Sequence, residues 1–151
     1  MSAWTIPIPA DGGKGLLDTN ILILRNRIEH GALPAEVAIS AVSLAELSAG
    51  VHQAHGPEAS AERARRLLLL QQVESEFDPL AFDATAARHY GRIAGAVSAA
   101  GRSPRRRVAD LMIAAVAAAH QLPLYTTNPA DYSGLGEFVE VVAVPRPHSE
   151  G

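Results

Sequence analysis

The sequence predicts an α/β fold in which a parallel β-sheet carries helices on both faces. Short apolar segments alternate along the chain with longer segments of helical periodicity. Such alternation is typical of a parallel sheet, because each crossover helix packs back onto the strands. A chain of 151 residues with 48% hydrophobic side chains is also long enough to bury one compact core. A ligand site is then expected outside the carboxyl ends of the strands.

The two ends of the chain are expected to lie outside the folded domain. Residues 1–13 contain two Ile-Pro steps and an Asp-Gly-Gly sequence, which are typical of irregular backbone. We therefore expect an irregular N-terminal arm over residues 1–13, one domain over residues 14–147 and a short tail over residues 148–151.

The first two strands are each expected to lead directly into a helix. Residues 15–19 contain a Leu-Leu pair and residues 37–40 a branched apolar run, and both segments have the length of buried strands. Apolar side chains at helical spacing follow the first strand, and a second helix is expected to begin at Ser43. These two units place two strand ends at one edge of the sheet.

The remaining segments continue the alternation of helices and strands. Asp83 is expected to cap the start of one of these helices, and the Gly-Arg-Ser-Pro sequence after it to form a turn. Three further strands in this part of the chain, with the two described above, give an expected five-stranded sheet. The expected ranges are a helix over 59–72, a third strand within 73–82, a helix over about 83–100, a helix over about 104–120, a fourth strand over 122–126 and a fifth over 138–142.

Composition excludes several classes of protein and site. The chain has no cysteine, which excludes a disulfide framework and a thiolate metal site. It has no apolar run long enough to cross a bilayer and no signal-peptide pattern, so we expect a cytoplasmic protein without membrane contact. The net charge of -3 argues against a generally basic surface. A local basic patch is nevertheless predicted where arginines crowd together, at Arg102, Arg105, Arg106 and Arg107.

Asp18 and Glu46 each follow an expected strand. Asp18 lies at the carboxyl end of the first strand, where parallel sheets bind ligands, but it is also a suitable helix N-cap. Glu46 lies three residues after Ser43, which is the spacing of a capping box. A first-turn carboxylate can also turn toward the edge where Asp18 lies. Both a structural and a catalytic role are therefore open for each acid.

Asp110 and Asp131 lie further along the chain. The helix around Asp110 is apolar nearly all round, and a carboxylate buried in it needs a metal ion or a cation beside it. An arginine is the alternative partner to a metal. Asp131 follows the fourth strand, where Asn128 as a cap and Pro129 at the first helical position would make it a first-turn acid favoured by the helix dipole.

Four acids expected at one edge of the sheet indicate a single converging pocket. Carboxylate oxygens in a chain without cysteine favour Mg²⁺ or Mn²⁺ over zinc. One or two such ions can activate a water and stabilise the charge on a phosphate that is being cleaved. The sequence therefore indicates metal-dependent phosphodiester hydrolysis.

Four segments of the sequence together resemble the PIN domains, and among them the VapC toxins. The segments are Leu17-Asp-Thr-Asn-Ile, Ser43-Leu-Ala-Glu-Leu-Ser-Ala-Gly, Asp110-Leu-Met-Ile-Ala-Ala and Thr127-Asn-Pro-Ala-Asp-Tyr, in this order. The resemblance extends from Gly15 to about Pro145. It implies a three-layer PIN-like fold with a five-stranded parallel sheet, an Mg²⁺- or Mn²⁺-dependent endoribonuclease, and the toxin half of a type II toxin–antitoxin pair. It also implies a small VapB-like antitoxin whose tail covers the site, and a homodimer.

The resemblance further implies roles for individual residues. Asp18, Glu46, Asp110 and Asp131 correspond to the catalytic acids, with Asp18 and Asp110 as metal ligands and the other two contributing partly through water. A second group is expected to support these acids by hydrogen bonds that orient carboxylates or water. It comprises Asn20, Thr126 and Asn128, and either Asn128 or Asp131 completes the site.

Arg105, Arg106 and Arg107 are expected to bind RNA phosphates beside the acidic pocket. With Ser103 as N-cap and Pro104 at the first position they would crowd a helix start, where the dipole disfavours positive charge unless an anion binds there. A salt-bridged or solvated run of arginines is the alternative. For the whole chain, the alternative to a nuclease is a PIN-like module that binds RNA or protein without cutting it.

Overall fold

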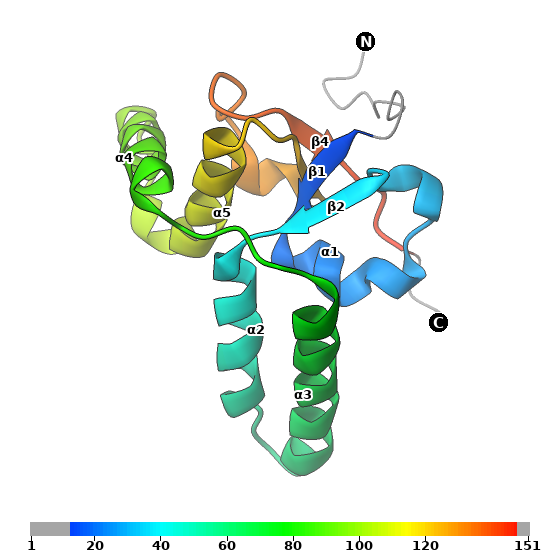
Figure 1. Cartoon of the computed structure of the whole chain (residues 1–151). Helices are drawn as coiled ribbons and strands as arrows, with labels where there is room; N and C mark the ends of the chain where they lie inside the picture. The colour runs from blue at the N-terminus through cyan, green and yellow to red at the C-terminus, as the bar shows by residue number, and fades with distance from the viewer. Residues whose placement is uncertain (1–12, 148–151) are drawn as a thin grey trace.

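A four-stranded parallel sheet forms the centre of the protein. The computed structural model describes residues 13–147; the rest of the expected arm and the expected tail over 148–151 lie outside the described residues. The strands lie in the order β2-β1-β3-β4, and all neighbouring pairs are parallel (Figure 1). Their bounds are β1 Lys14–Leu17, β2 Glu36–Ile39, β3 Leu124–Thr126 and β4 Val141–Ala143.

The predicted α/β class is confirmed, but the prediction of five strands is wrong for the described residues. The third strand was expected within 73–82, yet residues up to Glu76 continue helix α3 (Ala59–Glu76). Only Leu80 reaches the sheet edge, where its N–H donates to Ile39 and its carbonyl accepts from Ala41, both at 2.8 Å. Pro79 precedes it and has no N–H, so the pairing forms an isolated bridge and does not extend.

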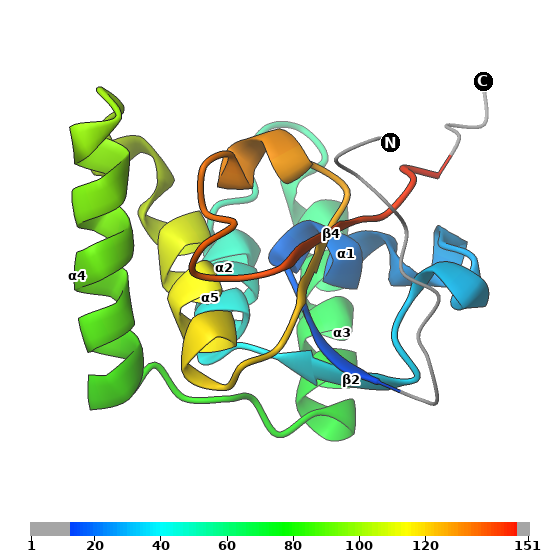
Figure 2. The ribbon, with the colours of Figure 1, turned by 90° about the horizontal axis from the view of Figure 1, so that it is seen from above.

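Helices cover both faces of the sheet and give three layers (Figure 2). On one face, Leu16 and Leu124 pack in a core with α4 (Ala84–Ala99) and α5 (Val108–Ala119). On the other face, Leu17 and Tyr125 pack in a second core with side chains of α1 (Thr19–Leu24) and α3. The side chains of successive strand residues thus point to opposite faces of the sheet. Those on each face are apolar because helices cover both faces.

Two helix starts differ from the predictions. Helix α2 (Ala41–His52) begins before Ser43, because the Ser40 hydroxyl accepts the N–H of Val42 at 2.9 Å and caps it. The expected helix over 104–120 is divided into a 3₁₀ turn, η3 (Pro104–Arg107), and α5, and the Ser103 side chain makes no capping hydrogen bond. Asp83 does cap α4 as predicted, by accepting the N–H of Ala86 at 3.0 Å.

The remaining short elements connect these units. After α1 the chain continues as the 3₁₀ turns η1 (Arg25–Arg27) and η2 (His30–Ala32), and η4 (Pro129–Tyr132) follows β3. Helices α2 and α3 lie side by side and project beyond the sheet (Figure 1). Among the described residues, no helix combines the length and the apolar character that crossing a membrane requires.

The strand order places a topological switch point between β1 and β3. The chain leaves β1 toward β2 on one side of the sheet, and β3 pairs with β1 on the other side. Ligand crevices of parallel sheets form outside the carboxyl ends of the strands at such a point. Here those ends are followed by Asp18 after β1 and by η4 after β3. Near the other end of β1, Gly15 leaves room for the Tyr125 ring of β3, since a Cβ atom there would collide with that ring.

Candidate active site

Asp18 is a buried acid at the end of β1. It is 5% exposed, and its Oδ1 accepts the N–H of Ile21 at 3.0 Å, so it caps α1. It also accepts a hydrogen bond from the Thr126 side chain at the end of β3. Burial raises the pKa of Asp18 above its ordinary value, and the charges of Asp131 and Glu46 raise it further, while the two hydrogen bonds oppose the rise. Asp18 is thus both the N-cap of α1 and an acid at the carboxyl end of β1.

Asp110 lies in the first turn of α5, half-buried beside the other acids. Burial is the largest cause that raises its pKa to about 6, followed by the negative charges of Asp131, Glu46 and Asp18. Arg107 lowers this pKa in part, but the ion pair that Arg107 forms is with Asp131. The alternative of an arginine as the direct partner of Asp110 therefore has no ion pair to support it among the described residues.

Glu46 lies on α2 and faces the same space as the first two acids. The prediction of a capping box at Ser43 is wrong, because Glu46 lies beyond the first turn of a helix that Ser40 caps. Its Oε1 instead accepts a 2.6 Å hydrogen bond from the Thr19 hydroxyl. That hydroxyl lies 2.9 Å from Ser43 Oγ, and since its own proton is donated to Glu46, Ser43 is the donor to Thr19. A short chain of hydroxyls thus holds Glu46 to the start of α1.

Asp131 lies in η4, on the other side of the cluster. Its Oδ2 accepts from Asn128 Nδ2 at 2.8 Å, and its Oδ1 lies 3.4 Å from Arg107 Nη1. Arg107 Nη1 also donates to the Ala130 carbonyl at 3.3 Å. Asn128 does not cap η4 with its side chain, contrary to the expected cap, and it instead holds Asp131. Of the two candidates for the last acidic position, Asn128 donates a hydrogen bond and Asp131 accepts it.

Three of the four acids line one cavity of about 720 Å³, which we call the acidic cavity. It contains Asp18, Glu46 and Asp110 and is rimmed by the exposed side chain of Asn20. Asp131 lines a neighbouring cavity, and its charge still raises the pKa values of Asp18 and Asp110. The structure therefore brings together the four acids that the sequence indicated, from the turn between β1 and α1 and from α2, α5 and η4.

The donor atoms of the acidic cavity fit a hard divalent cation that keeps part of its water. Among the described residues, no three acidic or histidine side chains are placed to hold an ion by themselves. Mg²⁺ usually binds through one or two carboxylates and retains several waters, so a closed protein cage is not required. Burial and then neighbouring acids raise the pKa values of both Asp18 and Asp110, and a cation bound between them would favour their ionised forms.

Three polar residues of the site were not identified from the sequence. Thr19 and Ser43 hold Glu46, as described above. Tyr132 is 2% exposed, and its hydroxyl has no hydrogen-bond partner among the described residues. Burial and then the charges of Asp18 and Asp110 raise the pKa of that hydroxyl, which places it beside the cluster as a neutral donor. Sequence analysis assigned no role to Tyr132 within the Thr127-Asn-Pro-Ala-Asp-Tyr segment, because a tyrosine after Asp131 is equally typical of a core position.

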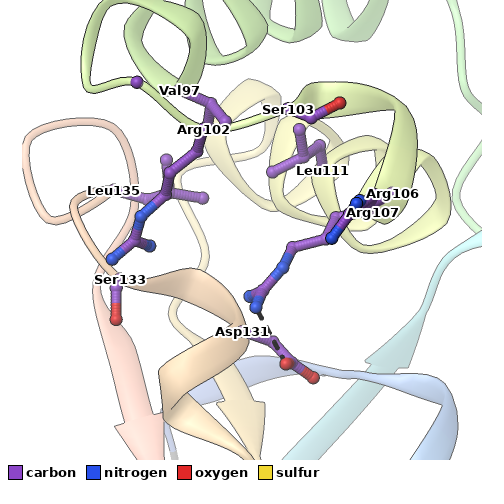
Figure 3. A pocket seen from close by; sticks show the side chains of 10 residues that line it. Val97, Arg102, Ser103, Arg106, Arg107, Leu111, Asp131, Ser133 and Leu135 are labelled. Atoms are coloured by element: carbon purple, nitrogen blue, oxygen red, sulfur yellow. Dashed lines mark ion pairs between the residues drawn. The ribbon is translucent and has the colours of Figure 1, made fainter.

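Of the four arginines of the predicted basic patch, three line one cavity and one lies outside its lining. Arg106 and Arg107 line the cavity that Asp131 borders, whereas Arg105, which is exposed as Arg106 is, does not line it. Arg102, which sequence reasoning placed in the patch but not in the site, lines the cavity as well (Figure 3). We call this the arginine cavity.

The substitution Glu46→Gln tests whether the exposed acid contributes more than its hydrogen bond to Thr19. Glutamine keeps an acceptor oxygen for the Thr19 hydroxyl but removes the charge. We expect RNA cleavage to fall by roughly 10- to 100-fold, as for groups that support a metal site, with the melting temperature unchanged. Parallel cleavage and thermal denaturation assays measure both. A loss of melting temperature with full cleavage would leave Glu46 a structural residue.

Comparisons with known proteins agree with this geometry. The family model described as PIN domain matches residues 15–133. Ribonuclease VapC5 of Mycobacterium tuberculosis is 36% identical over 135 residues, which cover 86% of this chain and 95% of that protein. The tRNA(fMet)-specific endonuclease VapC of Shigella flexneri is 30% identical and covers 82% of this chain and 92% of its own.

A solved structure shares the fold. The crystal structure of VapBC-5 from Mycobacterium tuberculosis, described as a member of the VapBC family of toxin-antitoxin systems, contains a chain that matches with a TM-score of 0.72 at 35% identity. The match covers 87% of this chain and 99% of that chain. The overall fold described above is therefore shared with that structure.

Proposed function

The chain belongs to the PIN domain family, and we propose that the acidic cavity is the active site of a metal-dependent endoribonuclease. The protein is a VapC-type ribonuclease, the toxin of a type II toxin–antitoxin pair. The observation that carries the assignment of the site is the convergence of Asp18 and Asp110 at the switch point of the sheet. Burial, and after it the charges of neighbouring acids, raise the pKa of each, as is common at functional sites.

Mg²⁺ or Mn²⁺ would be held by Asp18 and Asp110, with Glu46 and Asp131 acting partly through water. When bound, the cation supplies Lewis acidity toward a phosphate oxygen and lowers the pKa of a bound water. Asp18 is suited to the ligand role because the Ile21 N–H and the Thr126 hydroxyl favour its ionised form and fix its position. Thr126 is itself held, since its Oγ1 accepts the Asn128 N–H at 2.9 Å.

The remaining acids differ in what they contribute. Glu46 is exposed and tied to Thr19, which places it to accept a proton from a water in the acidic cavity. Asp131 is paired with Arg107 and Asn128, so it acts first as the anchor of the guanidinium next to the site. Arg107 in turn can face the negative charge that develops on the phosphate during cleavage.

A VapB-like antitoxin is the partner of the toxin. The acidic cavity is the surface that such an inhibitor would close, and it extends from the acids to Arg65 and Arg66 on α3. Both arginines are ion-paired to Glu62, at 2.6 Å and 2.8 Å. A homodimer is part of the proposal and is tested by light scattering of the purified chain.

Removal of divalent cations tests the proposed function. We expect the purified chain to cleave single-stranded RNA in Mg²⁺ or Mn²⁺, to stop in excess EDTA, and to resume when Mn²⁺ is restored. The variant Asp18→Asn, prepared identically, controls for contaminating ribonucleases. Cleavage that continues in EDTA would contradict the metal dependence. RNA binding without cleavage under every metal would instead favour the non-catalytic PIN-like module.

A further inference from the structure

The arginine cavity is a second concave site next to the acidic cavity. Its volume is about 650 Å³, which lies in the range of sites that bind small ligands. Three guanidinium groups line it, against one carboxylate. Figure 3 shows Arg102 extending toward Ser133 and Arg107 toward Asp131, so that both cross the space between the turn before α5 and the segment around η4.

Two of these arginines carry charges that the described part of the chain does not balance. Arg107 is paired with Asp131, but Arg102 and Arg106 have neither an ion pair nor a side-chain hydrogen bond among the described residues. Like charges held around one cavity repel one another, and this cost is relieved when an anion binds between them. The cavity as a whole therefore favours an anionic ligand that can accept several guanidinium hydrogen bonds.

The position of the cavity identifies the class of anion. Asp131 lines the arginine cavity, and its charge acts on both Asp18 and Asp110 of the acidic cavity. Leu111 lines the arginine cavity and directly follows Asp110 in α5. A polyanion with its reacting phosphate at Asp18 and Asp110 would thus carry a neighbouring phosphate to Arg102 and Arg106.

We propose that the arginine cavity binds a backbone phosphate of the RNA that flanks the cleaved bond. This inference rests on the proposed ribonuclease function and adds a second anchoring point for the substrate. Arg102 and Arg106 provide the free guanidinium groups, and Arg107 links the bound phosphate to Asp131. Phosphate contacts of this kind fix the register of the strand and carry no base specificity.

The test compares arginines inside and outside the cavity. Arg102→Ala and Arg106→Ala, separately and together, are compared with Arg105→Ala, which removes the same charge from η3 outside the lining. Binding of a fluorescent single-stranded RNA is titrated in EDTA, where the proposed enzyme leaves the strand intact. We expect each cavity substitution to weaken binding roughly tenfold and Arg105→Ala less than about twofold.

A salt titration and a chemical scan sharpen the comparison. The double variant should make the log–log salt dependence shallower by roughly 0.7, the value for the loss of one single-strand phosphate contact. Neutral methylphosphonates placed at successive positions of the RNA should weaken binding by the parent protein at one flanking position. At that position the same replacement should have little further effect on Arg102→Ala. Unchanged melting temperatures establish that the variants fold.

The outcomes separate this inference from the function on which it rests. If the parent protein cleaves RNA in Mn²⁺ and the cavity variants bind RNA as the parent does, the phosphate site is refuted while the nuclease stands. Equal effects of Arg105→Ala and Arg106→Ala would also refute it, because they would indicate a diffuse basic surface. Failure of the parent protein to cleave RNA in Mn²⁺ would instead refute the proposed function.

Discussion

We expect Asp110→Asn to lower RNA cleavage by roughly a thousandfold, since several kcal/mol of transition-state stabilisation depend on the cation that Asp110 holds. The same substitution should raise the melting temperature of the metal-free protein at pH 7. Burial and three neighbouring acids disfavour the charged form of Asp110, and asparagine removes that charge with little change of shape. With allowance for the partial exposure of Asp110, the rise should be roughly 2 to 4 °C.

The pH dependence of stability follows from the same acid. In the folded protein the pKa of Asp110 is raised to about 6 from an ordinary value of 3.8, so the folded state binds this proton more tightly than the unfolded state. The stability of the metal-free parent should therefore decrease as the pH rises from about 4 to about 6 and then change little. The advantage of Asp110→Asn should disappear below about pH 4, where the carboxyl is protonated in both states.

Thermal denaturation across this pH range, together with cleavage at pH 7, measures both effects. Asp83→Asn is the matched control, because it also replaces one carboxylate with an amide and asparagine caps a helix as well as aspartate does. It lies at the start of α4 and should alter neither activity nor the pH profile. Cleavage at the parental rate by Asp110→Asn would exclude this residue from the metal site.

Two substitutions of Asp18 separate its two roles. Asp18→Asn keeps an oxygen to accept the Ile21 N–H but loses the charge, whereas Asp18→Ala loses both. We expect both variants to lose cleavage by roughly a thousandfold, because both lack the ligand at the end of β1. Asp18→Ala should in addition be less stable than Asp18→Asn by about 1 kcal/mol, the usual contribution of an N-cap.

Cleavage assays and urea denaturation of the two variants give this comparison directly. The parent is not the best reference for stability, since removing the buried charge of Asp18 also relieves repulsion from Asp131 and Glu46. The difference between the two variants isolates the cap. Equal stability of the two would show that the Ile21 hydrogen bond contributes nothing, and cleavage by Asp18→Asn would remove Asp18 from the ligands.

The sequence was sufficient to predict a site residue where few roles can account for that residue type at its position. Asp110 lies in an apolar helix, where a carboxylate needs a cation or a metal ion beside it. The structure places it among other acids, which a metal ion could bind together. Asp18 at the end of a strand was expected both as a cap and at a ligand crevice, and it occupies both positions. The layered fold also followed from the alternation of apolar segments, because this pattern depends on local periodicity alone.

The features that sequence analysis missed depend on contacts between distant segments. Ser40 and Ser43 are equally good caps for α2, and only the packing of Ser43 against Thr19 decides between them. A strand was expected to begin at Val73, but residues 73–76 extend α3, and Val73 is buried in the second core. Arg102 and Arg106 share a cavity only because the turn before α5 faces η4.

Calorimetric titration of Mn²⁺ into the metal-free protein at pH 6 tests the metal site most directly. At this pH about half of the Asp110 carboxyls carry a proton, and binding of the cation must displace it. The structure predicts saturable binding with proton release, seen as a dependence of the heat on the ionisation enthalpy of the buffer. Both should be lost or strongly reduced in Asp110→Asn. An absence of Mn²⁺ binding by the parent protein, or equal affinities in the two proteins, would contradict the assignment of the acidic cavity as a metal-dependent active site.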